Sequence, residues 1–171
     1  MSAPAAGEPF WFEDYVPGEE HAAGSHTVEA AEIIAFARQW DPQPFHIDEE
    51  AARASVFGGL TACSAHIFSI FCSTSQRWQS GVVQQAVAGL GFDEMRMLGP
   101  VYAGDTLRCR SIIDSVRPSG SRPDCGVVVY HTELLNQRDE VVFSIRAASL
   151  MARDPVRRDP VRRDPDTEQG G

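Results

Sequence analysis

The spacing of hydrophobic residues predicts helices in the first half of the chain. Between residues 29 and 40, apolar side chains recur every three or four positions, and acidic residues occupy the first turn. A short helix is expected over residues 48–52, with Asp48 as its N-cap. The stretch from Ala62 to Trp78 is apolar on most sides, and a helix of that kind is buried.

The second half of the chain follows a period of two, which is typical of strands. Apolar residues alternate over residues 127–132, and the alternation resumes over residues 141–147 after a polar turn. Residues 107–113 are expected to form another strand, and Gly104 is expected at a turn that needs an unusual φ. A buried helix followed by antiparallel strands is an α+β arrangement, which one sheet wrapped around one central helix satisfies.

Both ends of the chain differ from its middle. Residues 1–9 are rich in Ala, Pro and Gly and are expected to be loose, whereas residues 153–171 repeat an Arg-Asp-Pro pattern. This repeat has too few apolar residues to pack, so a disordered tail is expected, and a tail that docks onto a partner is the alternative. One folded domain is therefore expected over residues 10–152.

Composition excludes several classes of function. The net charge of −9 argues against nucleic acid or an anionic membrane as a partner. All 15 basic residues are arginines, which excludes a Schiff-base lysine and a P-loop lysine. The 4 cysteines lack zinc spacing and are expected to be buried or partly buried thiols, with no metal site. The start of the chain lacks the pattern of a signal peptide, so a soluble cytoplasmic protein is expected.

Candidate chemistry is concentrated between Asp41 and Asp48. Asp41 and His46 lie on a chain that Pro42 and Pro44 stiffen, so a carboxylate and an imidazole can be held as a fixed pair in a loop. Such a pair can move a proton to or from water near neutral pH. The alternative is that Asp41 caps a turn and His46 is a packed loop histidine. Asp48 is expected to cap a helix rather than to react.

Separated blocks of this sequence resemble the MaoC-like dehydratases, which include the (R)-specific enoyl-CoA hydratases and have the hotdog fold. The resemblance runs from about residue 12 to about residue 152. The blocks occur in the family's order and are Phe36-Ala37-Arg38, the segment from Asp41 to Asp48, Phe57-Gly58-Gly59-Leu60, and Pro100-Val101 followed by Gly104-Asp105-Thr106-Leu107.

The resemblance implies that Asp41 and His46 activate one water molecule, which adds across the C2–C3 double bond of a trans-2-enoyl thioester. The product is an (R)-3-hydroxyacyl thioester, and the reverse reaction is a dehydration. Asp41 can orient or charge-stabilise the imidazole, or act as the acid itself, and the sequence leaves both roles open. No metal or redox cofactor is expected, and coenzyme A enters as part of the substrate. The acidic body argues mildly against acyl carrier protein, itself acidic, as the carrier.

An enolate forms during this reaction, and the resemblance implies that backbone N–H groups at the start of the central helix stabilise its oxygen. The family commonly has a glycine there, where this chain has Ser64. Gly59, Ser64 and Ser69 are the candidates for oxyanion or substrate binding. His66 is expected to pack behind the site, and Arg96 is a candidate contact for the phosphates of coenzyme A, with a solvated arginine as the alternative.

Two other functions remain open at this point. A hotdog thioesterase is one, although its Asp-x-x-Gly-His-x-Asn pattern is absent from this sequence. A non-catalytic subunit that binds acyl thioesters is the other, and Ser64 in place of glycine is its support. Because a single hotdog leaves a sheet edge uncovered, and the family pairs two hotdogs edge to edge, a homodimer or higher homo-oligomer is expected.

Overall fold

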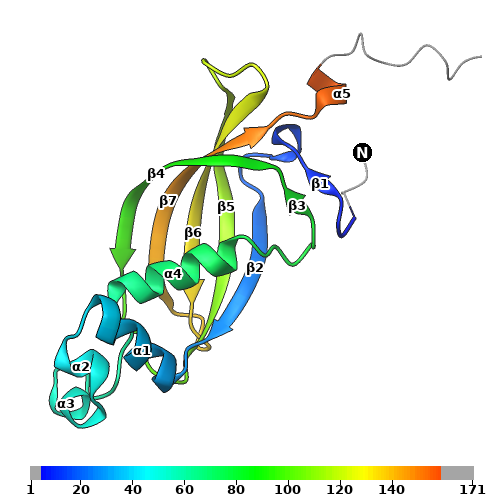
Figure 1. Cartoon of the computed structure of the whole chain (residues 1–171). Coiled ribbons are helices and arrows are strands. Elements are labelled where there is room, and N and C mark those ends of the chain that lie inside the picture. Colours follow the sequence, from blue (N-terminus) through cyan, green and yellow to red (C-terminus); the bar gives the residue numbers. More distant parts are fainter. Residues whose placement is uncertain (1–4, 159–171) are drawn as a thin grey trace, which may run out of the picture.

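The computed structural model describes residues 5–158 and shows one antiparallel sheet wrapped around one long helix (Figure 1). The helices are α1 (Ala30–Trp40), α2 (Pro44–Ile47), α3 (Glu49–Ala54), α4 (Ser64–Ser75) and α5 (Pro155–Arg158), with a 3-10 helix η1 (Phe12–Asp14). The strands are β1 (Pro9–Phe10), β2 (Glu20–Thr27), β3 (Val83–Gln84), β4 (Ala86–Met97), β5 (Thr106–Pro118), β6 (Cys125–Leu135) and β7 (Val141–Ala152). The expected α+β class and the hotdog fold are confirmed.

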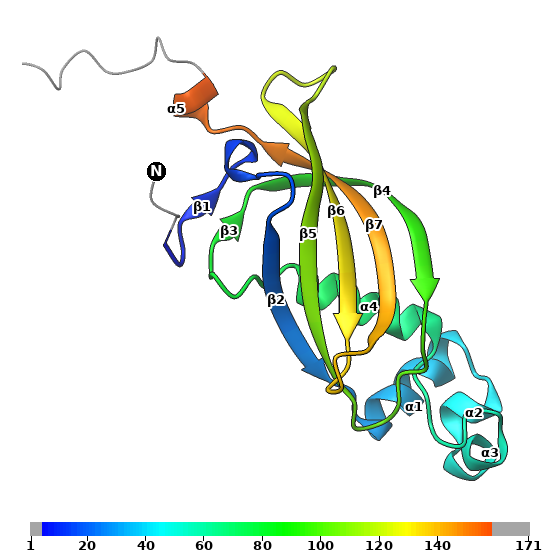
Figure 2. The ribbon, with the colours of Figure 1, turned by 180° about the vertical axis from the view of Figure 1, so that it is seen from behind.

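The main sheet has the order β2-β5-β6-β7-β4, and every neighbouring pair is antiparallel (Figure 2). Helix α4 packs in the hollow of this curved sheet (Figure 1). Alternate strand residues face α4 and build the core, as the period of two predicts. The most buried of them are Leu107, Ile113, Val128, Leu134, Phe143 and Ile145. No helix within residues 5–158 is long and apolar enough to cross a membrane.

Strand β4 forms one edge of the sheet and arches over α4 (Figure 1). Its register against β7 shifts at three places along its length. Bulges of this kind bend a strand, which lets β4 curve around the helix. All of its residues are exposed, including Leu90, Phe92 and Met95. The sheet therefore presents an uncovered apolar edge.

The predicted helices form, with two corrections. Helix α1 begins after Glu29 and ends at Trp40, and α3 begins after Asp48, whose carboxylate accepts the Ala51 N–H at 2.8 Å. The helix expected over residues 62–78 is shorter, since α4 ends at Ser75. The expectation that it is buried on most sides is wrong for this chain alone, because one side of α4 is exposed.

The proline-rich segment also differs from the loop that was expected. Pro44 begins the one-turn helix α2, and His46 lies in that turn. The fixed φ of proline suits the first helical position, where a missing N–H costs nothing. The expected turn at Gly104 is confirmed by its φ of 92°.

Parts of both chain ends contact the folded body. Gly7 N–H donates to the Gly81 carbonyl at 2.8 Å, and Pro9 begins β1. At the other end, Arg153 Nε donates to Glu13 at 2.7 Å, and Arg157 pairs with Asp14. The expected looseness of both ends stays a prediction. The rest of both predicted segments lies outside the described residues.

Candidate active site

Asp41 and His46 are brought together by the end of α1 and the single turn of α2. The Asp41 N–H donates to the Ala37 carbonyl at 2.9 Å and closes α1, while its side chain stays 39% exposed. The His46 side chain is only 9% exposed, and its Nε2 lies 4.0 Å from Asp41 Oδ2. This separation is too long for a direct hydrogen bond but short enough for both atoms to contact the same small molecule.

The other ring nitrogen of His46 fixes the protonation pattern. His46 Nδ1 lies 2.6 Å from the Thr61 carbonyl oxygen. Because a carbonyl oxygen only accepts, Nδ1 carries the hydrogen and Nε2 of the neutral ring keeps its lone pair. Nε2 and the Asp41 carboxylate are then two acceptors 4.0 Å apart. One water molecule can donate a hydrogen to each of them at normal hydrogen-bond lengths.

The N-terminus of α4 lies at the same place as His46. Cys63 is the N-cap and gives no side-chain cap, so the first N–H groups of α4, beginning with Ser64, face outward without a side-chain acceptor at the cap. Ser64 is not among the described non-glycine residues with positive φ. A serine therefore fits here without backbone strain, and its N–H is available as a glycine N–H would be.

His46 and Ser64 line one pocket of about 290 Å³, which we call the His46 pocket. Helix α4 contributes Ile67 as well, and the segment after β4 contributes Leu98. Phe57 closes another side. Asp41 is not among the lining residues and lies beside His46 at the pocket's half-exposed border. The arrangement places an acid–base group and a helix N-terminus around one largely apolar space.

Gly59 and Ser69 lie elsewhere. Gly59 faces the Tyr102 ring and borders a different small pocket beside α3. Ser69 is exposed, its hydroxyl donates to the Ala65 carbonyl at 2.9 Å, and it lines neither the His46 pocket nor the second pocket described below. Of the candidates for oxyanion or substrate binding, only Ser64 is brought to His46.

His66 packs behind the site, against α1. Its ring stacks on Phe36 at 4.6 Å, and its Nε2 lies 2.9 Å from Glu32 Oε1. Glu32 also contacts His26 Nε2 at 2.9 Å, so one carboxylate joins β2, α1 and α4. Partial burial raises the pKa of Glu32, but the hydrogen bonds with His66 and His26 outweigh it, and the pKa is lowered. This cluster holds the start of α4 in place.

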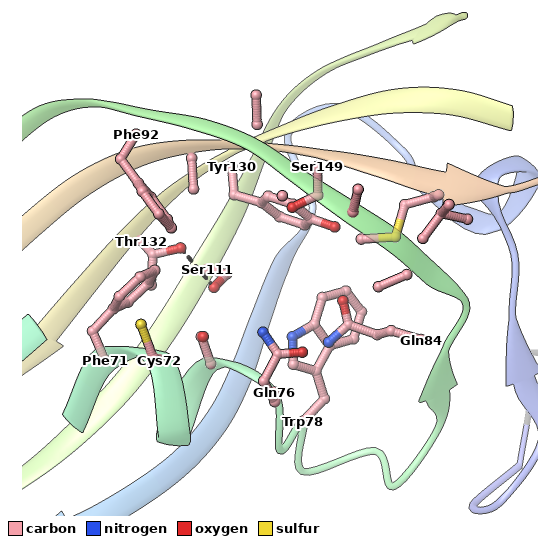
Figure 3. Close-up of a pocket in the computed structure, with 18 residues that line it drawn as sticks. Phe71, Cys72, Gln76, Trp78, Gln84, Phe92, Ser111, Tyr130, Thr132 and Ser149 are labelled. Atoms are coloured by element: carbon pink, nitrogen blue, oxygen red, sulfur yellow. Dashed lines mark hydrogen bonds between the residues drawn. The ribbon is translucent and has the colours of Figure 1, made fainter. Parts of the chain in front are cut away.

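A second pocket, of about 250 Å³, lies between the later half of α4 and the sheet (Figure 3). We call it the helix–sheet pocket. Phe71 and Cys72 line it from α4, and Phe92 lines it from β4. Cys72 is exposed, whereas Cys63 and Cys109 are buried, and burial raises the pKa of the Cys109 thiol to about 11. The expectation of buried or partly buried thiols is therefore wrong for Cys72, which is exposed because α4 is open on its side.

Some residues of the site escaped prediction from sequence. The Thr61 carbonyl orients His46, yet any residue type could supply it. Leu98 and Ile67 are far from His46 in the sequence, and only the folding of the chain brings them into the His46 pocket. Arg96 is exposed and donates to the Met95 carbonyl at 3.0 Å, so its role toward phosphates stays a prediction. Within residues 5–158, no group of three or more His, Cys, Asp or Glu side chains could hold a metal ion.

Comparison with known proteins agrees with this geometry. A family model described as the MaoC like domain matches residues 14–133. The chain belongs to the MaoC-like dehydratase family. The match includes the Asp41–Asp48 segment and all of α4, so it covers each part of the His46 pocket.

Named relatives of this MaoC-like chain include a hydratase. It is 33% identical over 147 residues to the mesaconyl-CoA hydratase of Cereibacter sphaeroides, covering 84% of this chain but only 42% of that protein. The solved MaoC-like dehydratase of Rhodospirillum rubrum is 40% identical, with a TM-score of 0.77, covering 85% of this chain and 99% of that one. R-hydratase PhaJ1 of Pseudomonas aeruginosa has a TM-score of 0.68 at 19% identity, covering 84% of this chain and 86% of that one, and this likeness shows the fold.

Proposed function

We propose that this protein catalyses the reversible hydration of trans-2-enoyl-CoA to (R)-3-hydroxyacyl-CoA. The observation that carries the proposal is the meeting of His46 and the N-terminus of α4 at one pocket, with the Asp41 carboxylate 4.0 Å from His46 Nε2. The likeness to a hydratase that acts on a CoA thioester supports the same reaction class. The (R) configuration rests on the resemblance of the Asp41–Asp48 segment to the (R)-specific enzymes.

A candidate group of this chain is available for each step of the proposed reaction. Water donates one hydrogen to His46 Nε2 and one to Asp41, which leaves an oxygen lone pair for attack on C3. His46 takes the first proton, and the Asp41 carboxylate stabilises the resulting imidazolium. The imidazolium then gives that proton to C2, so one water supplies both the hydroxyl and the hydrogen. The reaction transfers protons only and needs no metal or redox cofactor.

The thioester oxygen would bind at the N-terminus of α4. As the hydroxyl adds to C3, negative charge collects on this oxygen, and the Ser64 N–H and the positive end of the helix stabilise it. His46 and Ser64 line the same pocket, so this oxygen and the attacked carbon can occupy the pocket together.

The acyl chain would run along α4 from the His46 pocket into the helix–sheet pocket. Ile67 lines the first pocket and Phe71 lines the second, one helical turn further along. The Phe92 ring contacts Phe68 and Phe71 edge-on, at 5.1 and 6.1 Å, and stands beside this path. Coenzyme A would then lie outside the His46 pocket, on the side of the exposed Arg96.

We further propose that two copies pair through β4. The two outer strands of the sheet differ sharply, since β2 is polar and β4 exposes a row of large apolar residues. Exposed strand edges of this kind invite pairing with another chain. Both pockets border β4 or the segment that follows it, so pairing would also shield them from water.

The direct test is the absorbance of the enoyl thioester band of crotonyl-CoA and decenoyl-CoA with the full chain. We expect the band to fall with time and chiral separation of the product to give the (R)-alcohol. Loss of the band together with release of free thiol would instead indicate a thioesterase, because hydrolysis of the C–S bond also removes the conjugated thioester. Ligand binding with no turnover of either substrate, by protein of native secondary structure, would reject the proposed hydration.

A further inference from the structure

The helix–sheet pocket has polar groups in its wall, whereas an unsubstituted fatty acyl chain requires only an apolar lining. Ser111 on β5 and Thr132 on β6 face each other across the strands, and their hydroxyls are hydrogen-bonded at 2.9 Å (Figure 3). Both residues are almost fully buried and line the pocket. Two hydroxyls carry two hydrogens, and their mutual bond uses one. One donor remains for a third partner.

Tyr130 adds an unsatisfied group to the same wall. It is 7% exposed and lines the pocket, yet its hydroxyl has no hydrogen-bond partner among the described residues. The nearby Tyr15 hydroxyl donates to Gln84 at 3.2 Å. It lies close enough to Tyr130 to influence the pKa of that hydroxyl, but it does not meet normal hydrogen-bond geometry with it. Burial raises the pKa of Tyr130, so its hydroxyl stays protonated and remains a donor. A buried polar group of this kind calls for a partner.

The residues that line the helix–sheet pocket indicate which kind of acceptor could bind these hydroxyls. The residues that line the pocket include hydroxyls and the amides of Gln76 and Gln84, but no Arg, His, Asp or Glu. A buried carboxylate would be left without a counter-charge, which is costly. A neutral oxygen can accept from Tyr130 and from the hydroxyl pair at no such cost. The lining therefore suits a hydroxyl or keto oxygen.

The distance between the helix–sheet pocket and the proposed site of reaction matches the length of a medium-length acyl chain. Ser64, at the proposed oxyanion position, and Cys72, at the pocket, are eight residues apart on α4. At about 1.5 Å per residue, this is a span of ~12 Å along the helix. A medium-length acyl chain that starts at the His46 pocket reaches the polar wall with its far end.

We propose that the helix–sheet pocket selects acyl chains that carry a neutral oxygen, as a hydroxyl or keto group, near their far end. Tyr130 and the Ser111–Thr132 pair are the residues that recognise this oxygen. The proposal rests on the proposed hydratase function, because it places the acyl chain of that substrate.

The test compares decenoyl-CoA with ω-hydroxydecenoyl-CoA and ω-carboxydecenoyl-CoA as substrates of the full chain. We expect kcat/KM to be higher for the hydroxylated chain by about fivefold for each hydrogen bond gained, and lowest for the carboxylated chain. Tyr130→Phe, and Ser111→Ala with Thr132→Val, should each reduce the preference for the hydroxyl. Hydration of crotonyl-CoA, which is too short to reach the wall, should stay unchanged in these variants.

A binding measurement separates this proposal from the proposed function. Calorimetry with the saturated decanoyl-CoA and ω-hydroxydecanoyl-CoA needs no turnover. Tighter binding of the hydroxylated ligand that is lost in Tyr130→Phe supports the pocket even if hydration fails. Equal binding of both ligands, or a preference that survives all the substitutions in folded variants, overturns it and leaves water as the occupant of the polar wall.

Discussion

At the scale of single residues, the site depends on one hydrogen bond that no motif encodes. The segment from Asp41 to Asp48 supplies the reactive groups, but the Thr61 carbonyl decides which nitrogen of His46 is free. Asp48 is in the same segment and has a structural task, because its carboxylate caps α3. Neighbouring residues of one motif thus divide between chemistry and folding.

The first prediction separates these two tasks. We expect Asp41→Asn and His46→Gln each to lower kcat for crotonyl-CoA by about 100-fold or more, the usual contribution of a general acid–base group. Their unfolding midpoints in urea should stay near that of the wild type. Asp48→Ala is the matched control, and it should lose ~1 kcal/mol of stability with little change in kcat. Unchanged activity in both catalytic variants would place the reaction at another site.

At the scale of elements, α4 serves several purposes at once. Its first turn borders His46, its later turns line the helix–sheet pocket, and His66 ties it to α1 through Glu32. The apolar pattern of the helix predicts burial, but small and polar residues leave one side open. The helix is therefore part of the core of the fold and, in the proposed function, would also guide the acyl chain.

The second prediction concerns the bond between α1 and α4. Because the pKa of Glu32 is lowered in the folded protein, its contribution to stability is present above its usual pKa of 4.5 and is lost as the pH falls through the lowered value. Glu32→Gln should therefore reduce stability at pH 7 and bring it closer to the wild type in acid. Urea unfolding between pH 7 and pH 3 measures the difference. Glu29→Gln, an exposed neighbour on the same helix, should leave the pH dependence as it is, and identical curves for all three proteins would contradict the prediction.

The third prediction tests the path of the acyl chain along α4. Cys72→Trp would fill the helix–sheet pocket from an exposed helix position, so decenoyl-CoA should lose about tenfold or more in kcat/KM, since overpacking costs ~1–3 kcal/mol. Crotonyl-CoA should be hydrated as before. Ser69→Trp is the control, because Ser69 is exposed on the same helix and lines neither pocket. Equal losses for both variants would place the acyl chain elsewhere.

At the scale of the whole molecule, the sheet has an exposed apolar edge along β4. Leu90 is 51% exposed and Phe92 is 54% exposed, on a strand that has a hydrogen-bonded neighbour on one side only. An uncovered apolar edge of this length is a site of association. The acidic body of the chain would make association through the proposed β4 interface selective, because like charges elsewhere repel.

The fourth prediction is a homodimer that forms through this edge. Light scattering should give a mass twice the chain's 18.7 kDa. The double variant Leu90→Arg with Met95→Arg should shift the protein to the monomer. It should also reduce the rate of hydration, because both pockets border this part of the chain. Val56→Arg is the matched control, an apolar residue outside β4 that is 96% exposed. A wild-type monomer, or a dimer that only Val56→Arg disrupts, would reject pairing through β4.

The sequence predicted the parts of this protein that depend on local order along the chain. Helical spacing placed α1, the capping position placed α3, and alternation placed the long strands. It also located Asp41, His46 and Ser64, because proline geometry and a helix start are local properties. It missed α2 and the ion pairs of Arg153 and Arg157, since a single turn and a few ion pairs leave almost no periodic signal.

Only the tertiary structure decided which distant groups meet. The sequence could not show that Thr61 faces His46, that Glu32 joins two histidines, or that Ser69 points away from the pockets, because each follows from how α1, α4 and the sheet pack. The polar wall of Ser111, Tyr130 and Thr132 has the same origin, since strand register aligns residues that are far apart in the chain. Local patterns therefore fixed the elements and the reactive residues, and long-range packing fixed the pockets that use them.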